Sequence, residues 1–148
     1  MSAAVSDEIV ARMQRLEDIE AIKQLKATYI RCADTKQWKE WGQLFTEDCR
    51  LDTEAGVHEG REHVVNVISE AMKDGVTVHR VTMPEITIAG PNTATAIWAM
   101  QDEVSLIYKG QPHQFRGFGY YHESYVRTPA GWKVKSCKLV RHKVEAAA

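Results

Sequence analysis

Apolar residues recur every three or four positions along the first part of the chain, and this is the period of an amphipathic helix. The row consists of Ile9, Met13, Leu16, Ile19, Ile22, Leu25, Tyr29 and Cys32. Ser6 is the expected N-cap, because Asp7 and Glu8 follow it where the positive end of a helix favours anions. The pattern predicts one long helix that ends near Asp34 and points Tyr29 inward.

Two shorter helices are expected next. The first covers residues 37–45, and its apolar side consists of Trp38, Trp41, Leu44 and Phe45. The second covers residues 61–73, and its apolar side consists of Val64, Val65, Ile68 and Met72. Gly75 is expected to end this second helix in the left-handed conformation. Between the two helices, we expect a short strand over residues 49–53 and a turn over residues 56–60.

From Val76 onward the period changes to two, which predicts strands. The four expected strands cover residues 76–89, 93–108, 113–127 and 132–144. Their connections contain Gly and Pro and are short enough for hairpins. Pro84 indicates a bulge or an edge position in the first strand. Helices followed by such a meander predict an α+β fold, in which one curved antiparallel sheet wraps around the N-terminal helix.

Length and composition favour a single domain over residues 1–148 with an ordinary globular core. The net charge is −1 and the basic residues are dispersed, so nucleic acid and anionic membrane are not expected partners. Three cysteines without a CxxC pair favour a reducing compartment. With no signal peptide and no apolar run of about 20 residues, the expected location is cytoplasmic.

Three polar groups depart from the apolar pattern and are candidates for chemistry. Asp34 closes the buried row, Tyr29 belongs to it, and His79 lies in the first long strand, with either face of that strand free to look inward. An imidazole with an ordinary pKa of ~6.5 can take up and return a proton near neutral pH. The three residues therefore form a hypothetical site. Each also has a purely structural interpretation. Asp34 would be a turn residue, Tyr29 a core tyrosine and His79 a core histidine.

Asp102 interrupts the apolar face of the second long strand. A buried carboxylate needs a cation, a donor, nearby water or a proton, and Arg116 is one possible partner. The third strand carries aromatic rings on both faces, so we expect one face to line a pocket and the other to pack on a second subunit. The stretch from His58 to His63 lacks the i, i+4 spacing of a zinc helix and contains Gly60, so no metal site is expected there.

Several stretches together resemble the SnoaL-like branch of the nuclear transport factor two-like superfamily. They are residues 16–25, the helix end at 29–34, the helix start at 60–62, the strand at 77–80 and the terminal Gly131 to Val134. The resemblance covers nearly the whole chain. It implies a cone of curved antiparallel sheet that encloses an apolar cavity, with helices closing the wide end. Because this superfamily hosts several reactions as well as non-catalytic binders, the fold alone does not select one.

Asp34 and His79 also fall where scytalone dehydratase, the bile-acid dehydratases and hexachlorocyclohexane dehydrochlorinase place an aspartate that orients a histidine. Tyr29 matches a tyrosine of the bile-acid dehydratases, and Asp102 matches their second carboxylate. This resemblance implies that Tyr29, Asp34 and His79 are catalytic. The candidate substrate contacts are Asp102, Trp98, Tyr108, Phe118 and Tyr121.

The implied activity is a cofactor-independent lyase that acts on a small apolar cyclic or aromatic substrate. Such an enzyme would release water, or formaldehyde from a lignin-derived aryl compound, and would need no metal. The resemblance also implies a homo-oligomer, either a dimer or a trimer. Two alternatives stay open: an isomerase or cyclase with Asp34 or Asp102 as the base, and a non-catalytic domain that binds a small molecule.

Overall fold

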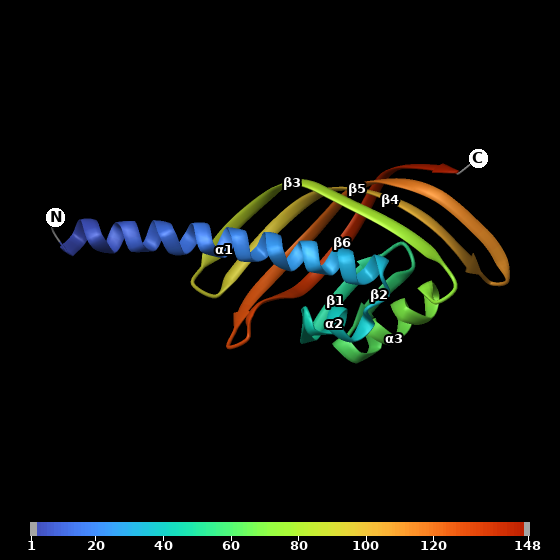
Figure 1. Cartoon of the computed structure of the whole chain (residues 1–148), viewed down its shortest axis with the longest axis horizontal. Coiled ribbons are helices and arrows are strands. Elements are labelled where there is room, and N and C mark those ends of the chain that lie inside the picture. The colour runs from blue at the N-terminus through green and yellow to red at the C-terminus, as the bar shows by residue number, and fades with distance from the viewer. Residues whose placement is uncertain (1–2, 147–148) are drawn as a thin grey trace.

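The computed structural model describes residues 3–146 as three helices and one six-stranded sheet. The elements are α1 (Ala3–Asp34), α2 (Trp38–Gln43), β1 (Phe45–Thr53), β2 (Gly56–Glu59), α3 (Arg61–Met72), β3 (Val76–Gly90), β4 (Thr93–Tyr108), β5 (Gln111–Thr128) and β6 (Gly131–Ala146). Figure 1 shows α1 running beneath a strongly curved sheet, with α2 and α3 near β1 and β2. The predicted α+β fold is confirmed, and the sheet is open rather than closed.

The strands lie in the order β2-β1-β6-β5-β4-β3. The meander from β3 to β6 is antiparallel throughout, as predicted, whereas β1 pairs with β6 in parallel. The register of β3 shifts between Thr82 and Glu85, which confirms the bulge expected at Pro84. Between the start of β3 and this bulge, His79 pairs with Asp102 of β4, and Asp102 pairs with Gly117 of β5. Three neighbouring strands therefore bring these positions together.

Two details of the middle of the chain differ from the prediction. The expected turn at residues 56–60 contains β2, which pairs with β1. Gly75 does not adopt a positive φ, so it is not a left-handed helix stop. Instead, a Cβ at Gly75 would lie 2.8 Å from the carbonyl oxygen of Ser105 and 2.9 Å from Cβ of Leu106. Close packing against β4 therefore favours glycine at this position.

The long helix also differs from the prediction in its first half. It begins at Ala3, so Ser6 lies within it and is not the N-cap. Ile22 is fully buried, but Ile9, Met13 and Leu16 are 41%, 55% and 66% exposed. The intervals in the apolar row are mostly three residues, shorter than the 3.6-residue turn, so the row winds around the helix. The first half of α1 extends beyond the sheet (Figure 1).

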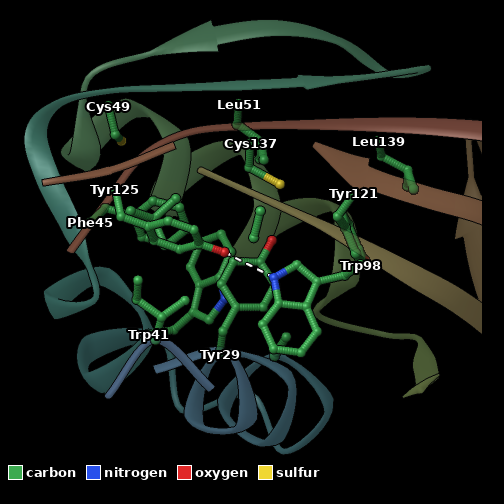
Figure 2. Packing of buried hydrophobic residues seen from close by; sticks show 14 of the residues in the cluster. Tyr29, Trp41, Phe45, Cys49, Leu51, Trp98, Tyr121, Tyr125, Cys137 and Leu139 are labelled. Carbon is green, nitrogen blue, oxygen red and sulfur yellow. Dashed lines mark hydrogen bonds between the residues drawn. The ribbon is translucent and has the colours of Figure 1, made fainter. Parts of the chain in front are cut away.

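The core lies between the second half of α1, α2 and the concave face of the sheet. Figure 2 shows its aromatic side chains in contact, with Tyr29 among them. The ring centre of Tyr29 lies 5.3 Å from that of Trp41 and 5.7 Å from that of Phe45. All three cysteines are free and buried, as their spacing predicted. No helix within residues 3–146 is long and apolar enough to cross a membrane.

Candidate functional site

Asp34 and His79 meet where the end of α1 approaches the start of β3. Nδ1 of His79 lies 2.6 Å from Oδ1 of Asp34, and the backbone N–H of His79 donates to Oδ2 at 2.9 Å. The hydroxyl of Thr77 donates to Oδ1 at 3.0 Å. Thr77 and His79 share the buried face of β3, so the structure settles which face of this strand looks inward. The predicted contact between Asp34 and His79 is confirmed.

The surroundings of Asp34 determine the charge at this contact. Burial acts to raise the pKa of Asp34, but the hydrogen bonds from His79 and Thr77 outweigh burial and hold that pKa below its ordinary value of 3.8. The carboxylate is therefore ionised near neutral pH and accepts a hydrogen bond from the Nδ1–H of His79. This arrangement fixes the ring orientation, and in the neutral tautomer that donates from Nδ1 the other ring nitrogen, Nε2, is the acceptor.

Nε2 of His79 faces a second buried carboxylate. It lies 4.0 Å from Oδ2 of Asp102, whose side chain is 1% exposed. Asp102 forms an ion pair with Arg141 of β6, and Arg141 also pairs with Glu54. Of the partners expected for a buried Asp102, the structure supplies a cation, but the suggested partner Arg116 is wrong. Arg116 lies on the exposed face of β5 and pairs with Glu103 at 3.3 Å.

Arg141 is the site residue that sequence reasoning missed. Within β6 it follows Cys137 and Leu139 at alternate positions, and both of those residues are buried. A cation that continues an inward-facing apolar alternation was the available signal, the same one that singled out Asp102. Nε of Arg141 and Oδ1 of Asp102 are buried without a hydrogen-bond partner among the described residues. One donor and one acceptor are therefore left over beside His79.

Gly117 makes room for this ion pair. A Cβ at Gly117 would lie within 3.0 Å of both Nε of Arg141 and Oδ1 of Asp102. Atoms cannot approach so closely without a shift, so the pair lies directly against the β5 backbone only because residue 117 has no side chain.

Tyr29 lies deeper in the core and forms a different set of contacts. Its ring packs edge-on against Tyr121, with ring centres 6.4 Å apart. Burial, and then the nearby Cys137, raise the pKa of Tyr29 well above its ordinary value of 10.0. Tyr29 is thus a neutral phenol. Its ring contacts are with Trp41, Phe45 and Tyr121, and within residues 3–146 no hydrogen bond joins it to His79. Its catalytic role stays a prediction.

A buried polar network surrounds Tyr29. Lys26 of α1 and Glu123 of β5 form an ion pair, and their side chains are 1% and 0% exposed. Nζ of Lys26 also lies 4.1 Å and 3.7 Å from the ring centres of Tyr29 and Tyr121. The network continues from Glu123 through the hydroxyl of Tyr125 to Nε1 of Trp98. These contacts attach α1 to the concave face of the sheet.

The other predicted substrate contacts are divided between the two faces of the sheet. Trp98 and Tyr121 are opposite one another in β4 and β5, and both are buried on the concave face (Figure 2). Phe118 belongs to the other face of β5, where Nζ of Lys143 lies 5.5 Å from its ring centre. Tyr108 is 54% exposed at the end of β4. Phe118 is thus on the face opposite to His79, and Tyr108, six residues beyond Asp102, is exposed at the end of its strand.

A hollow of about 550 Å³ opens at one end of the sheet. It is lined by Val76, Val78, Glu103, Val104, Ser105, Gln114, Phe115, Arg116, Glu145 and Ala146. His79, Asp34 and Asp102 do not line it, so the apolar cavity expected around His79 stays a prediction. Within the described part of the chain, no three His, Cys, Asp or Glu side chains are grouped so that they could hold a metal ion.

The geometry defines an α+β protein with a histidine-aspartate pair at the junction of its long helix and curved sheet. A SnoaL-like domain model matches residues 14–138, and the chain belongs to this family. The structure is similar to the hexachlorocyclohexane dehydrochlorinase LinA-type3 from Novosphingobium barchaimii, with a TM-score of 0.81 at 16% identity. The match covers 93% of this chain and 94% of that chain.

Two proteins from Novosphingobium aromaticivorans are also similar. One is a scytalone dehydratase-like protein with a TM-score of 0.78 and 18% identity, and the match covers 90% of each chain. The other is an NTF2-like protein with a cystatin-like fold, a TM-score of 0.73 and 25% identity, matched over 91% of this chain and 88% of that chain. At these identities the likeness to solved structures establishes the fold.

Proposed function

We propose that this protein is a lyase in which His79 transfers protons and Asp34 orients it. The observation that carries the proposal is the 2.6 Å contact between Nδ1 of His79 and Oδ1 of Asp34, reinforced by the bond from the His79 backbone. Because Asp34 occupies Nδ1, the free nitrogen Nε2 is the base. Two similar structures are named as a dehydrochlorinase and as scytalone dehydratase-like, and this supports an elimination reaction.

The reaction begins when Nε2 removes a proton from a carbon next to an activating carbonyl or ring. The electrons of the broken C–H bond form a C=C bond, and the leaving group departs from the adjacent carbon with its bonding electrons. If that group is a hydroxyl, the imidazolium returns the proton and water is released. If it is chloride, the proton passes to solvent. Asp34 stabilises the imidazolium in either case.

Arg141 has a different role in the proposed reaction. Its Nε is a buried donor without a partner among the described residues, and Arg141 pairs with Asp102, whose Oδ2 lies 4.0 Å from Nε2 of His79. A donor fixed in a site that excludes water stabilises negative charge as it develops on a substrate oxygen. Asp102 in turn holds the guanidinium in place. Since Asp102 is already paired with Arg141, the geometry favours His79 over Asp102 as the base.

The preferred substrate class is a small cyclic or aromatic molecule, because Trp98 and Tyr121 present rings on the concave face. An aryl substrate with a hydroxymethyl group fits the same machinery. His79 would take the hydroxyl proton, the C–C bond would break to give formaldehyde, and the imidazolium would protonate the carbon left behind. Water, chloride and formaldehyde are thus three products that the same proton-transfer site could release from different substrates.

The proposal is tested by incubating the protein with a cyclic β-hydroxy ketone, a chlorinated cyclohexane and a hydroxymethyl aryl compound, and following products by mass spectrometry. His79→Ala should lower turnover about 10²–10⁴-fold, the usual contribution of a general base. His122→Ala, on the exposed face of β5, is the matched control and should retain activity. Full activity of His79→Ala would contradict the proposal, and tight binding without turnover would favour the non-catalytic alternative.

A further inference from the structure

The first half of α1 exposes a row of large apolar side chains that its own sheet does not cover. The row, called here the N-terminal stripe, consists of Val5, Ile9, Met13 and Leu16, which are 42%, 41%, 55% and 66% exposed. Residues 4–17 are all exposed, and Figure 1 shows this part of α1 extending beyond the sheet. A helical segment as short as residues 4–17 is marginal in water without packing, so a partner surface would stabilise this part of α1.

The N-terminal stripe lies on the side of α1 that faces away from the sheet. At 3.6 residues per turn, its four members share one side, and the buried residues Asp18 and Ile22 project from the other. After Leu16 the stripe side continues with Glu20, Lys23 and Ala27, which are exposed and form no large apolar surface. The apolar row therefore ends close to where the body of the protein begins.

The charges beside the N-terminal stripe are complementary in an antiparallel pair. Glu8, Arg12 and Arg15 flank the stripe on the same side. In an antiparallel pair of identical helices, equivalent flanks face each other. Centring the pair on the middle of the stripe, between Val10 and Ala11, places Glu8 of one copy between Arg12 and Arg15 of the other.

A parallel pair offers less of this complementarity. In a parallel arrangement the Glu8 flank faces the opposite flank of the other copy, which carries Ser6, Val10 and Glu17, so Glu17 can face Arg12 but Glu8 meets no cation. We propose that the N-terminal stripe packs antiparallel against the same stripe of a second copy of this chain, across a two-fold axis, with Glu8 bonded to Arg12 and Arg15 of that copy. This inference does not depend on the proposed function.

Sedimentation equilibrium over a range of protein concentrations tests the pairing, with circular dichroism as the check of folding. The wild type should form dimers. Met13→Glu should raise the dimer dissociation constant at least about tenfold, because it places a carboxylate in the apolar contact. Ala11→Glu is the matched control, since residue 11 lies in the same exposed segment on the side away from the stripe, and it should dimerise like the wild type.

Charge reversal tests the direction of the pair. Glu8→Arg alone gathers like charges and should weaken the dimer, and so should Arg12→Glu with Arg15→Glu. The triple variant should restore the dimer. A monomeric wild type, a trimer, or a dimer that persists in Met13→Glu would overturn the proposal, the last by placing the interface elsewhere. Failure of the triple variant to recover would overturn the antiparallel register.

Discussion

Asp34 binds His79 through both oxygens of its carboxylate, one to the imidazole ring and the other to the backbone N–H. One side chain at the end of α1 thus fixes both the position of the strand and the orientation of the ring. Within β3 the contact involves Thr77 and His79 alone among the hydrogen-bond partners of Asp34 in the described residues. It gives the long helix a direct role in the candidate site.

Folding stability should depend on the ionisation of Asp34. The pKa of Asp34 is lowered in the folded protein from its ordinary value of 3.8. The ionised form therefore stabilises the fold fully at pH values above that ordinary pKa, and this contribution is lost as pH falls through the lowered pKa. The free energy of unfolding of the wild type should exceed that of Asp34→Asn most above about pH 5, and the difference should shrink toward about pH 3. Urea unfolding at several pH values measures it. A difference that stays constant with pH would contradict the account.

The Asp102 and Arg141 pair should be strongly coupled. Arg141→Ala leaves a buried carboxylate without its cation and should lower the free energy of unfolding by about 3–5 kcal/mol. Combining it with Asp102→Asn should destabilise less than the two single changes added together. Arg116→Ala is the matched control, because its pair with Glu103 is about half exposed, and it should change stability by less than about 1 kcal/mol. Additive effects of the two buried changes would argue against a direct pair.

Gly117→Ala should disturb the same pair through packing. The added Cβ would lie within 3.0 Å of both Asp102 and Arg141, and such overpacking costs about 1–3 kcal/mol of stability. Turnover should fall as well, since the pair faces His79. In the control Gly90→Ala, the new Cβ would lie 3.4 Å from Oγ1 of Thr93, and little change is expected. Equal stability of the two variants would show that Gly117 is not needed to seat the pair.

Lys26 should anchor α1 to the sheet. Replacing it in Lys26→Met leaves Glu123 buried and without its cation, which should lower the free energy of unfolding by about 3–5 kcal/mol. Chemical denaturation is the measurement. The double change with Glu123→Gln should recover part of the loss, because no unpaired charge then stays in the core. Lys23→Met, one turn earlier on an exposed position, is the control, and a loss as large there would refute the anchoring role.

The sequence pattern predicted the fold because local periodicity and turn residues define the helices and the long strands. It also drew attention to Asp34 and Asp102, which end or interrupt an apolar face, and the family resemblance supported His79 as their partner. It failed where the answer depends on three-dimensional register. Arg141 comes next to Asp102 only after β6 pairs with β5 across a register shift at Phe118 and Gly119, which no local pattern reveals.

The exposed first half of α1 was missed for a different reason. An apolar row with short intervals looks continuous in one dimension, although in a real helix it winds from one side to the other. Ile9 and Ile22 therefore belong to different surfaces, one exposed and the other buried. Adding up the rotation around the helix axis along the whole row, rather than the interval between neighbours, separates these two surfaces.

The most direct test of the central claim is nitrogen-15 NMR of histidine-labelled protein at pH 8, which needs no substrate. The account predicts that His79 carries its proton on Nδ1, that Nε2 is unprotonated, and that the Nδ1 proton resonates at low field because its bond to Asp34 is short. Asp34→Asn should abolish the low-field signal. A proton on Nε2 in the wild type, or an identical spectrum in Asp34→Asn, would contradict the claim that Asp34 prepares His79 as a base.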